Sequence, residues 1–563
     1  MRNFFVFLIF IQFSLTTTQF SLSTTPFSLN AAHALPSKGS EIVMSAASPL
    51  AVQSGQRIAE LGGNPVDVAV AIVLGMSVTN ATFSALGGGG FAIVKMGKSV
   101  EVLDFRERAP LATNPDYFLK KSKNASMTGG AAVGVPGLPA GLYDLHKKYG
   151  KIHWSRLFDD PIRLAQKGFR VSGEYSEKLA TNASRFSPGA KLHFLKNGVT
   201  PYKPGELFIQ KGLAKALSEM RNRNIVSFYN GPIAKDIVTS VRAAGGDMTL
   251  KDMQEYRAVW RKPMVTEYSG YKLYLMPPPS SGGIVTQTAL KLIEKLDVKK
   301  YPSRSIDEYH MLGQILSRAF RGRTLIADPD HYSVATEKLL ANEYLEELAK
   351  SIKLDEATAI EPLKEEDFSN KESAETTHIS VLDKFGNAVA MTVTLNGNFG
   401  SAVASEKYGI MLNNEMDDFT TRPGEPNMFG LVQGQGNMIA PGKRPLSSMS
   451  PTLVEKGGKV IMAVGAPGGP RIISAVIQVL YRVLGRGEEL QSAVEAPRVH
   501  HQLLPNKLFI DNDRFSPEVV DGLKLKKNSV EESWPARIYV CKKTDEILEA
   551  VVDTRGEGTA SGF

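Results

Sequence analysis

The chain has 563 residues, 42% of them apolar and 22% charged, which lies near the globular average and excludes a disordered, collagen-like or coiled-coil protein. Its single cysteine, Cys541, excludes an intrachain disulfide framework and any metal site built from several cysteines. The net charge of +8 is small for this length and comes without a long basic run, so no nucleic-acid partner is expected.

The first residues have the pattern of an export signal. Arg2 is followed by an apolar stretch from Phe4 to Leu15, and Ala32-His33-Ala34 is an A-x-A-like cleavage site. The apolar stretch is shorter than the roughly 20 residues that span a bilayer. We therefore expect residues 1–34 to be a secretory signal peptide, the mature protein to be periplasmic or secreted, and no membrane span to remain. A soluble protein with an apolar N-terminus and an uncleaved anchor are the alternatives.

The mature chain reads as mixed α and β structure without an internal repeat. Helices are predicted at 51–61 and 66–78, and strands at 91–95 and 100–105, the second strand ending just before Arg106. Polar helices are expected over 140–260, and a further helix from about Ile284. Residues 351–375 are acidic and polar, which predicts an exposed linker.

A β-hairpin is predicted directly after this linker. Residues 376–382 and 388–395 have strand character and flank the turn 383–387. If the turn is centred on Phe385, Thr376 lies opposite Thr394, with Cβ atoms about 5 Å apart. On spacing alone these could be ordinary sheet threonines.

Further along, a buried strand at 460–464 runs into the glycine turn 465–469, with Pro470 near the start of a helix that includes Ile472 onward. Backbone N–H groups at such a helix N-terminus can face an anion. A turn needed only for close packing is the alternative, and it is the one we favour for the earlier run Gly87–Gly90.

Conventional hydrolase signatures are missing from the sequence: it contains no G-x-S-x-G, H-E-x-x-H or P-loop motif. His500 and His501 are adjacent, so on a strand they would face opposite ways, which favours structural histidines over a metal pair. The role of His378 is left unassigned.

Together these motifs resemble those of the gamma-glutamyltranspeptidase family. The resemblance covers nearly all of the chain after the export segment. It is carried by Asp104–Glu107, Glu375–Val381, Thr392–Asn396, Asn413–Phe419, Lys443–Thr452, Gly465–Gly469 and Ala560–Phe563, and by Gly62–Asp67, Leu86–Phe91 and Pro277–Pro279.

The resemblance implies an α+β fold, the four-layer αββα sandwich of N-terminal-nucleophile hydrolases, built from two subunits cut from one precursor. It places the cut between Glu375 and Thr376, giving a large subunit 35–375 and a small subunit 376–563 that form a heterodimer. Thr376 would be the nucleophile, with its new α-amino group as base. The family gives Thr394 the role of orienting the nucleophile, and Gly468 and Gly469 that of the oxyanion hole.

The implied substrates are glutathione and other γ-glutamyl compounds, with water, amino acids or peptides as acceptors and no cofactor or metal. The free carboxylate and ammonium of a glutamyl group need partners of both signs. Arg106 can bind the carboxylate in a bidentate manner, and the resemblance adds the hydroxyls of Ser447 and Ser448 and places Asn396, Glu415 and Asp418 at the ammonium. Each also has a plainer interpretation: Arg106 in a surface ion pair with Glu107, the serines in a turn, and the acids in solvated loops.

Two departures from the family pattern and two rival functions remain. Glu375 precedes the cut where some relatives have an amide, and Phe429 stands in a lid loop where some have a tyrosine. A cephalosporin (glutaryl) acylase of the same fold is one rival, which Asp418 argues against. An exported, non-catalytic amino-acid or peptide-binding protein is the other, which Thr376 and Thr394 argue against.

Overall fold

The computed structural model describes residues 36–361, 376–534 and 536–563. The predicted signal peptide, Glu375 and most of the segment before it lie outside the described residues. The first part of the expected linker, residues 351–361, is described: it contains no helix or strand and its residues are exposed or half-buried, in agreement with the predicted exposed linker. Buried Arg318 donates to the carbonyl oxygens of Ser351 and Thr358 at 3.0 and 2.8 Å, which fixes this stretch against its helix.

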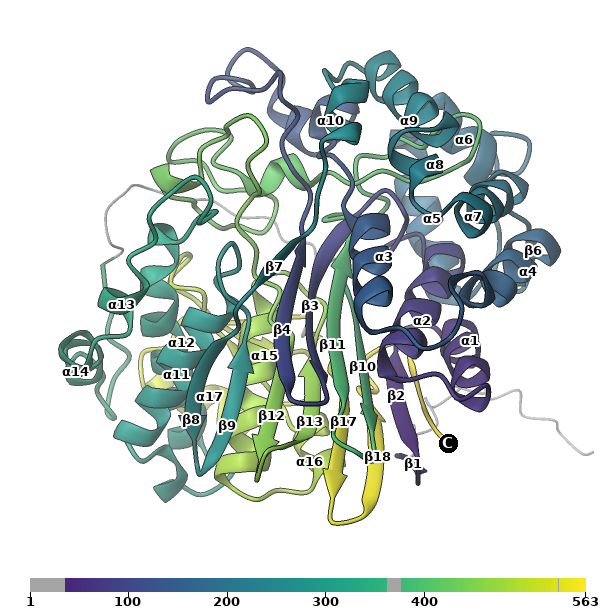
Figure 1. Cartoon of the computed structure of the whole chain (residues 1–563). Coiled ribbons are helices and arrows are strands. Elements are labelled where there is room, and N and C mark those ends of the chain that lie inside the picture. Colours follow the sequence, from purple (N-terminus) through teal and green to yellow (C-terminus); the bar gives the residue numbers. More distant parts are fainter. Residues whose placement is uncertain (1–35, 362–375, 535) are drawn as a thin grey trace, which may run out of the picture. The chain divides into compact units, whose positions relative to one another are not determined.

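Two seven-stranded antiparallel sheets form the centre of the fold (Figure 1). The first contains, in spatial order, β1 (Ser37–Gly39), β18 (Ile547–Val552), β17 (Tyr539–Thr544), β13 (Lys459–Gly465), β12 (Thr452–Lys456), β9 (Tyr271–Leu275) and β8 (Met264–Tyr268). The second contains β19 (Thr559–Gly562), β2 (Ile42–Ala46), β10 (Thr377–Asp383), β11 (Ala388–Thr394), β3 (Gly89–Met96), β4 (Ser99–Phe105) and β7 (Val259–Arg261).

Helices cover the outer face of each sheet. The second sheet packs against α1 (Pro49–Glu60), α2 (Pro65–Thr79) and α3 (Leu138–Tyr149), and the first against α11 (Gly282–Lys295) and α15 (Arg471–Leu480), beside α12 (Ile306–Phe320). The two sheets contact each other through β10, β11, β13 and β17. This is the four-layer αββα arrangement that was predicted.

The remaining helices form a lobe and several short connections. They are α4 (Asp159–Lys167), α5 (Gly173–Asn182), α6 (Pro188–Phe194), α7 (Lys211–Arg223), α8 (Val226–Tyr229), α9 (Pro232–Ala243), α10 (Leu250–Gln254), α13 (Thr336–Leu339), α14 (Asn342–Lys350), α16 (Leu490–Glu495) and α17 (Pro517–Leu525). Two small sheets complete the fold, one of β14 (Val499–His500), β15 (Leu508–Asp511) and β16 (Val530–Ser533), the other of β5 (Phe169–Arg170) and β6 (Leu207–Phe208).

The predicted early helices are confirmed, and their caps explain where they start. Ser48 caps α1 by accepting from the N–H of Ala51, and Asn64 with Asp67 forms a capping box at α2. Every residue of α2 is buried, because this helix is enclosed between the second sheet and its neighbours. That enclosure explains a helix that is apolar on all sides.

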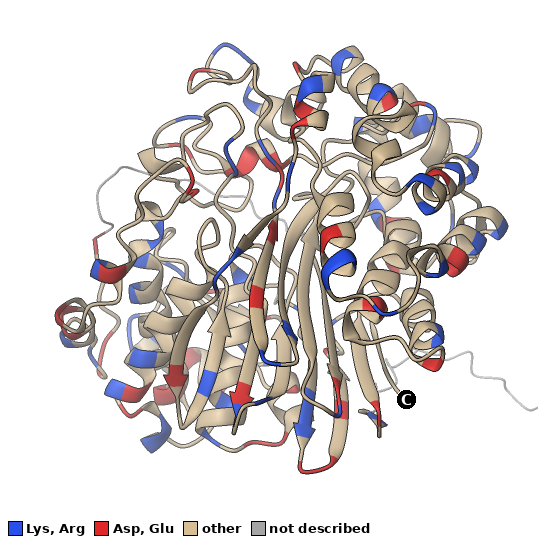
Figure 2. Ribbon diagram, viewed as in Figure 1, with Lys and Arg blue, Asp and Glu red and all other residues tan. Residues whose placement is uncertain are grey.

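Strand alternation divides the apolar side chains between two cores. Ile379 and Val381 of β10 face the core under α2, whereas Leu382 and Ala390 belong to the core between the sheets. All residues of β10 and β11 are buried, since both faces of the hairpin are covered. Charged residues lie mainly on the helices, loops and strand ends, as the coloured ribbon of Figure 2 shows.

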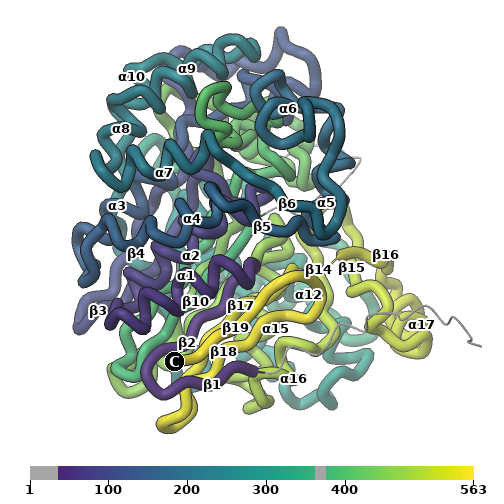
Figure 3. Tube along the Cα trace, turned by 90° about the vertical axis from the view of Figure 1, so that its right-hand side faces the viewer, coloured from purple at the N-terminus to yellow at the C-terminus, as the bar shows by residue number. Residues whose placement is uncertain are grey.

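The last strands of the chain pair with its first described strands. Figure 3 shows β17, β18 and β19 beside β1 and β2. β18 pairs with β1 and β19 with β2, and the carbonyl oxygen of Phe563 accepts from the N–H groups of Ser40 and Glu41. Within the described ranges, no helix has the length and apolar character to cross a membrane.

Candidate active site

The two threonines of the hairpin meet as predicted. Thr377 pairs with Val393 and His378 with Thr392, which confirms the predicted register. Thr376 directly precedes β10, and its Oγ1 lies 3.5 Å from Oγ1 of Thr394, with both residues buried. Thr394 Oγ1 also accepts from the N–H of Asn396 at 2.8 Å. The hairpin thus holds two hydroxyls within hydrogen-bonding reach of each other.

His378 is fixed between the sheets. Its Nδ1 lies 2.8 Å from Thr392 Oγ1 and its Nε2 lies 3.0 Å from Ser380 Oγ. Burial lowers the pKa of His378 to about 3, so the ring is neutral at physiological pH. Both ring nitrogens are occupied by neighbours, which indicates a structural role.

A small pocket of about 300 Å³ opens at Thr376. Except for Gly468, every predicted catalytic and substrate-binding residue lines it: Arg106, Thr376, Thr394, Asn396, Glu415, Asp418, Ser447, Ser448 and Gly469. These residues are spread along the sequence from Arg106, directly after β4, to Gly469, shortly before α15. We refer to this site as the inner pocket.

Arg106 is the central charge of the inner pocket. It is 1% exposed and forms ion pairs with Glu415 and with Asp418, the latter at 2.6 Å from Nη2 to Oδ2. It also donates to the carbonyl oxygens of Pro445 and Leu446. The alternative of a surface ion pair with Glu107 is therefore wrong, although Glu107 lies 3.9 Å away as a third buried carboxyl group.

Three carboxyl groups around one guanidinium cannot all ionise easily. Burial raises the pKa of Glu107 to about 7 and raises the pKa values of Glu415 and Asp418, while Arg106 opposes each shift. Repulsion from the neighbouring carboxyl groups of Glu107 and Asp418 adds to the rise in the pKa of Glu415. The three acids therefore hold a proton more readily than free carboxyl groups do.

The glycine turn after β13 has the shape of an anion site. Gly468 and Gly469 have φ values of +129° and +54°, and their carbonyl oxygens accept from the N–H groups of Arg471 and Ile472 at the start of α15. Within the described part of the chain, the N–H groups of Gly468 and Gly469 have no protein acceptor. Pro470 is the N-cap of α15, one position from where it was predicted.

The other predicted binding residues are held by local contacts. Ser447 Oγ accepts from the N–H of Met449, and Asn396 Nδ2 donates to the carbonyl oxygen of Asn414. Asp418 Oδ1 accepts from Asn427 Nδ2 at 2.9 Å. These contacts fix the side chains before any substrate binds.

Arg323 is a pocket residue that the sequence analysis missed. It lies in the short 3₁₀ segment Arg321–Leu325, is 4% exposed, and donates to Gln433 Oε1 at 2.7 Å and to Ser448 Oγ at 3.4 Å. Burial lowers its pKa to about 10. No local sequence pattern marks this residue, because only the tertiary fold brings it to Ser448.

Phe429 covers the glycine turn from the predicted lid loop. A Cβ atom placed on Gly469 would lie 2.8 Å from Cδ1 of the Phe429 ring. The carbonyl oxygen of Phe429 accepts from Gln502 Nε2 at 3.2 Å. The loop therefore closes over the inner pocket through an aromatic ring and a backbone contact, without a hydroxyl.

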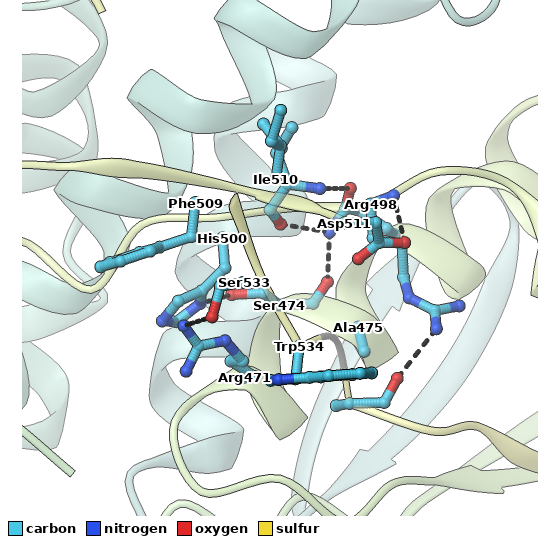
Figure 4. Close-up of a pocket in the computed structure, with 13 residues that line it drawn as sticks. Arg471, Ser474, Ala475, Arg498, His500, Phe509, Ile510, Asp511, Ser533 and Trp534 are labelled. Atoms are coloured by element: carbon cyan, nitrogen blue, oxygen red, sulfur yellow. Dashed lines mark hydrogen bonds between the residues drawn. The ribbon is translucent and has the colours of Figure 1, made fainter. Parts of the chain in front are cut away.

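The two adjacent histidines have structural partners. His500 Nδ1 lies 2.6 Å from Ser474 Oγ and its Nε2 lies 2.9 Å from Gln502 Oε1, and Figure 4 shows His500 next to Phe509. Burial lowers the pKa of both histidines, to about 4 for His501. Across the described residues, no group of three or more His, Cys, Asp or Glu side chains is arranged to hold a metal ion.

Comparison with known proteins agrees with this geometry. Residues 51–563 match the gamma-glutamyltranspeptidase family. The glutathione hydrolase proenzyme of Escherichia coli (strain K12) is 38% identical over 504 residues, which cover 88% of this chain and 87% of that protein.

Two solved structures extend the comparison. Gamma-glutamyltranspeptidase from Helicobacter pylori has a TM-score of 0.54 at 35% identity, over 55% of this chain and 91% of that one. Cephalosporin acylase from Bacillus halodurans has a TM-score of 0.84 at 23% identity, over 97% and 99% of the two chains, a likeness that shows the common fold alone. By the family match and the E. coli relative, the chain belongs to the gamma-glutamyltranspeptidase family, with the fold of the N-terminal-nucleophile hydrolases.

Proposed function

We propose that this protein is a glutathione hydrolase and γ-glutamyl acyltransferase that works through a covalent glutamyl-Thr376 intermediate. The observation that carries the proposal is the pair of threonine hydroxyls 3.5 Å apart at the mouth of a buried pocket that holds Arg106, Glu415 and Asp418. A nucleophile beside a pocket with both signs of charge suits a donor that carries an amino-acid head group.

Acylation begins with attack of Thr376 Oγ1 on the γ-carbonyl carbon of the donor. The α-amino group created by cleavage before Thr376 takes the hydroxyl proton, and Thr394 holds the nucleophile by a hydrogen bond. The N–H groups of Gly468 and Gly469 stabilise the oxyanion. The C–N bond then breaks, and the proton passes from the α-ammonium to the leaving amine.

Deacylation repeats these steps in reverse with a new nucleophile. Water, an amino acid or a peptide amine attacks the ester carbon, the α-amine takes its proton, and Thr376 leaves as the free hydroxyl. The product is glutamate or a new γ-glutamyl compound. Neither half of the reaction needs a cofactor.

Head-group recognition uses the charges of the inner pocket. The donor's carboxylate is assigned to Arg106 with the hydroxyls of Ser447 and Ser448, and Arg323 adds a second guanidinium beside Ser448. The donor's ammonium is assigned to Asp418, Glu415 and the Asn396 amide. Charge-assisted contacts of this kind are stronger than neutral ones and fix orientation.

The proposal also includes how the precursor is cleaved and where the mature enzyme is found. Cleavage between Glu375 and Thr376 gives a large subunit 35–375 and a small subunit 376–563 that stay together as a heterodimer. Residues 1–34 direct export, so the mature enzyme is periplasmic or secreted.

The test is incubation of the purified protein with glutathione, with and without a dipeptide acceptor. The expected products are glutamate with cysteinylglycine, and in addition a γ-glutamyl dipeptide when the acceptor is present. Unchanged glutathione in both reactions contradicts the proposal.

A further inference from the structure

Arg323 differs from Arg106, the other arginine of the inner pocket, in having no carboxylate partner. Arg106 pairs with Glu415 and Asp418 and donates to two backbone carbonyl oxygens. Arg323 lines the same pocket and is buried, yet among the described residues no carboxylate lies within ion-pair distance of its guanidinium group. A buried cation without a paired anion is unfavourable. The carboxylate of a bound donor would supply the missing counter-charge.

The guanidinium group of Arg323 also has hydrogen-bond donors to spare. Its Nη1 donates to Gln433 Oε1 at 2.7 Å and its Nη2 to Ser448 Oγ at 3.4 Å, while its Nε has no acceptor in the described part of the chain. Burial lowers its pKa to about 10 against the attraction of Asp418, and Arg106 lowers it further, so the group is still charged at neutral pH. Because Asp418 is already paired with Arg106 at 2.6 Å, it does not fully neutralise Arg323.

The contact with Ser448 fixes the role of that hydroxyl. Ser448 Oγ accepts from Arg323, so the hydroxyl's own hydrogen is left for another acceptor. Ser447 Oγ likewise accepts, from the N–H of Met449, and both serines line the inner pocket. A hydroxyl that accepts from a cation is polarised, which strengthens the hydrogen bond that it donates in turn. Arg323 therefore prepares Ser448 to donate to a carboxylate.

The other contact of Arg323 reaches the lid loop, residues 423–442. Gln433 of this loop is buried, and its Oε1 accepts from Arg323. Its Nε2 donates to the carbonyl oxygen of Asp418 at 3.3 Å. One amide group therefore connects the lid loop to Arg323, at the proposed carboxylate end of the head group, and to Asp418, at the proposed ammonium end.

Packing alone leaves this part of the lid loop loosely attached. A cavity of about 490 Å³, counting its open mouth, lies between residues 431–434 of the loop, the 3₁₀ segment Arg321–Leu325 and residues 502–504. Atoms that line a cavity lack van der Waals partners on that side. The two hydrogen bonds of Gln433 are therefore an important part of what holds the loop in place here.

We propose that Arg323 is a positioning residue that makes donor selection and lid closure depend on the donor's α-carboxylate. When the carboxylate binds, Arg323 gains a counter-charge, orients the Ser448 hydroxyl toward the carboxylate, and holds the lid loop over the head group through Gln433. The inference rests on the proposed function and adds to it a residue that couples carboxylate recognition to the lid.

The first test compares two donors that differ only at the α-carboxyl group, γ-glutamyl-p-nitroanilide and its α-amide. The readout is the ratio of their kcat/KM values, which is internal to each variant, so a general loss of activity cancels. The wild type is expected to favour the carboxylate donor. In Arg323→Gln this preference should fall by about tenfold, the size of one charge-assisted contact. Arg323→Lys keeps the charge and should retain part of the preference.

Arg321→Gln is the matched control. Arg321 lies in the same 3₁₀ segment, but its Nη1 pairs with Glu347 at 2.8 Å, and it lines neither the inner pocket nor the cavity beside the lid loop. Its donor preference should equal that of the wild type.

The second test measures lid closure without turnover. Hydrogen exchange of the lid-loop amides is followed in the presence of glutamate or of its α-amide. In the wild type, glutamate should slow exchange several-fold more than the α-amide does. Arg323→Gln and Gln433→Leu should lose this difference, because each breaks the contact between the guanidinium group and the loop. Gln435→Leu, which changes an exposed glutamine of the same loop, should keep the difference.

Three results would overturn the inference: equal use of the two donors by the wild type, an unchanged donor ratio in Arg323→Gln, or equal protection of the lid loop by glutamate and its α-amide in the wild type. If Arg323→Gln does not fold, an unchanged ratio in Arg323→Lys has the same meaning. A wild type that releases no p-nitroaniline from either donor overturns the proposed function itself. The two failures are therefore distinguishable.

Discussion

At the scale of single residues, the inner pocket is organised around the neutralisation of Arg106. Its guanidinium contacts two carboxylates and two backbone carbonyl oxygens in a site almost closed to water. Buried charges are tolerated only when they are paired and hydrogen-bonded, so this arrangement is set before the donor binds. Binding of an amino-acid head group then exchanges some of these internal contacts for contacts with the donor.

Asp418→Asn should weaken γ-glutamyl donors while leaving cleavage before Thr376 intact. The change removes the negative charge that faces the donor's ammonium, a contact worth about 1.5–3 kcal/mol, so the KM for glutathione should rise about tenfold or more. Asp417→Asn is the matched neighbour: Asp417 accepts from Ser126 Oγ and the N–H of Met428 instead of lining the inner pocket. Steady-state kinetics with an equal KM in both variants would contradict the assignment of Asp418.

Glu107→Gln should flatten the dependence of stability on pH. Burial raises the pKa of Glu107 to about 7, so the folded state keeps a proton that the unfolded chain loses above about pH 4.5. Its contribution to stability is therefore complete below the unfolded pKa and is lost as pH rises from about 4.5 through 7. The melting temperatures at pH 5 and pH 8 should differ less in Glu107→Gln than in the wild type. An equal difference in the two proteins would contradict the raised pKa of Glu107.

At the scale of elements, the turn between β13 and α15 lies between the inner pocket and Phe429 of the lid loop. Gly469 has φ +54° and its missing side chain leaves room for the Phe429 ring. Glycine at this position therefore permits both the left-handed backbone conformation and the close approach of the lid loop.

Gly469→Ala should lower kcat by about tenfold or more, because a methyl group must displace the Phe429 ring or rotate the N–H that faces the oxyanion. The double variant Gly469→Ala/Phe429→Ala separates these causes, since removing the ring relieves the clash and leaves the strained backbone. The measurement is the rate of single-turnover acylation. Full activity in Gly469→Ala would show that the turn takes no part in catalysis.

The sequence predicted those elements whose residues form a recognisable local pattern. The β10–β11 register followed from the turn around Phe385, and the start of α15 from the glycine run before Pro470. The place of Arg323 in the inner pocket was not predictable, because it depends on which distant segments the fold brings together. The packing of residues 351–361 was also missed, since a polar composition does not reveal that buried Arg318 binds their backbone.

At the scale of the whole molecule, the two proposed subunits are interleaved. β10 and β11 lie between β2 and β3, and β19 pairs with β2 on its other edge, so strands from before and after the proposed cut alternate in one sheet. Separating the subunits would break several strand pairings and open both cores. Cleaved chains should therefore elute together in size-exclusion chromatography and separate only under denaturing conditions.

The most direct test of the central claim is intact-mass analysis with N-terminal sequencing of the purified active protein. The account predicts two chains, the smaller one starting at Thr376 and ending at Phe563, and a single uncut chain without activity in Thr376→Ala. A wild-type protein that turns over glutathione as one uncut chain, or a smaller chain that begins at another residue, would contradict Thr376 as the N-terminal nucleophile.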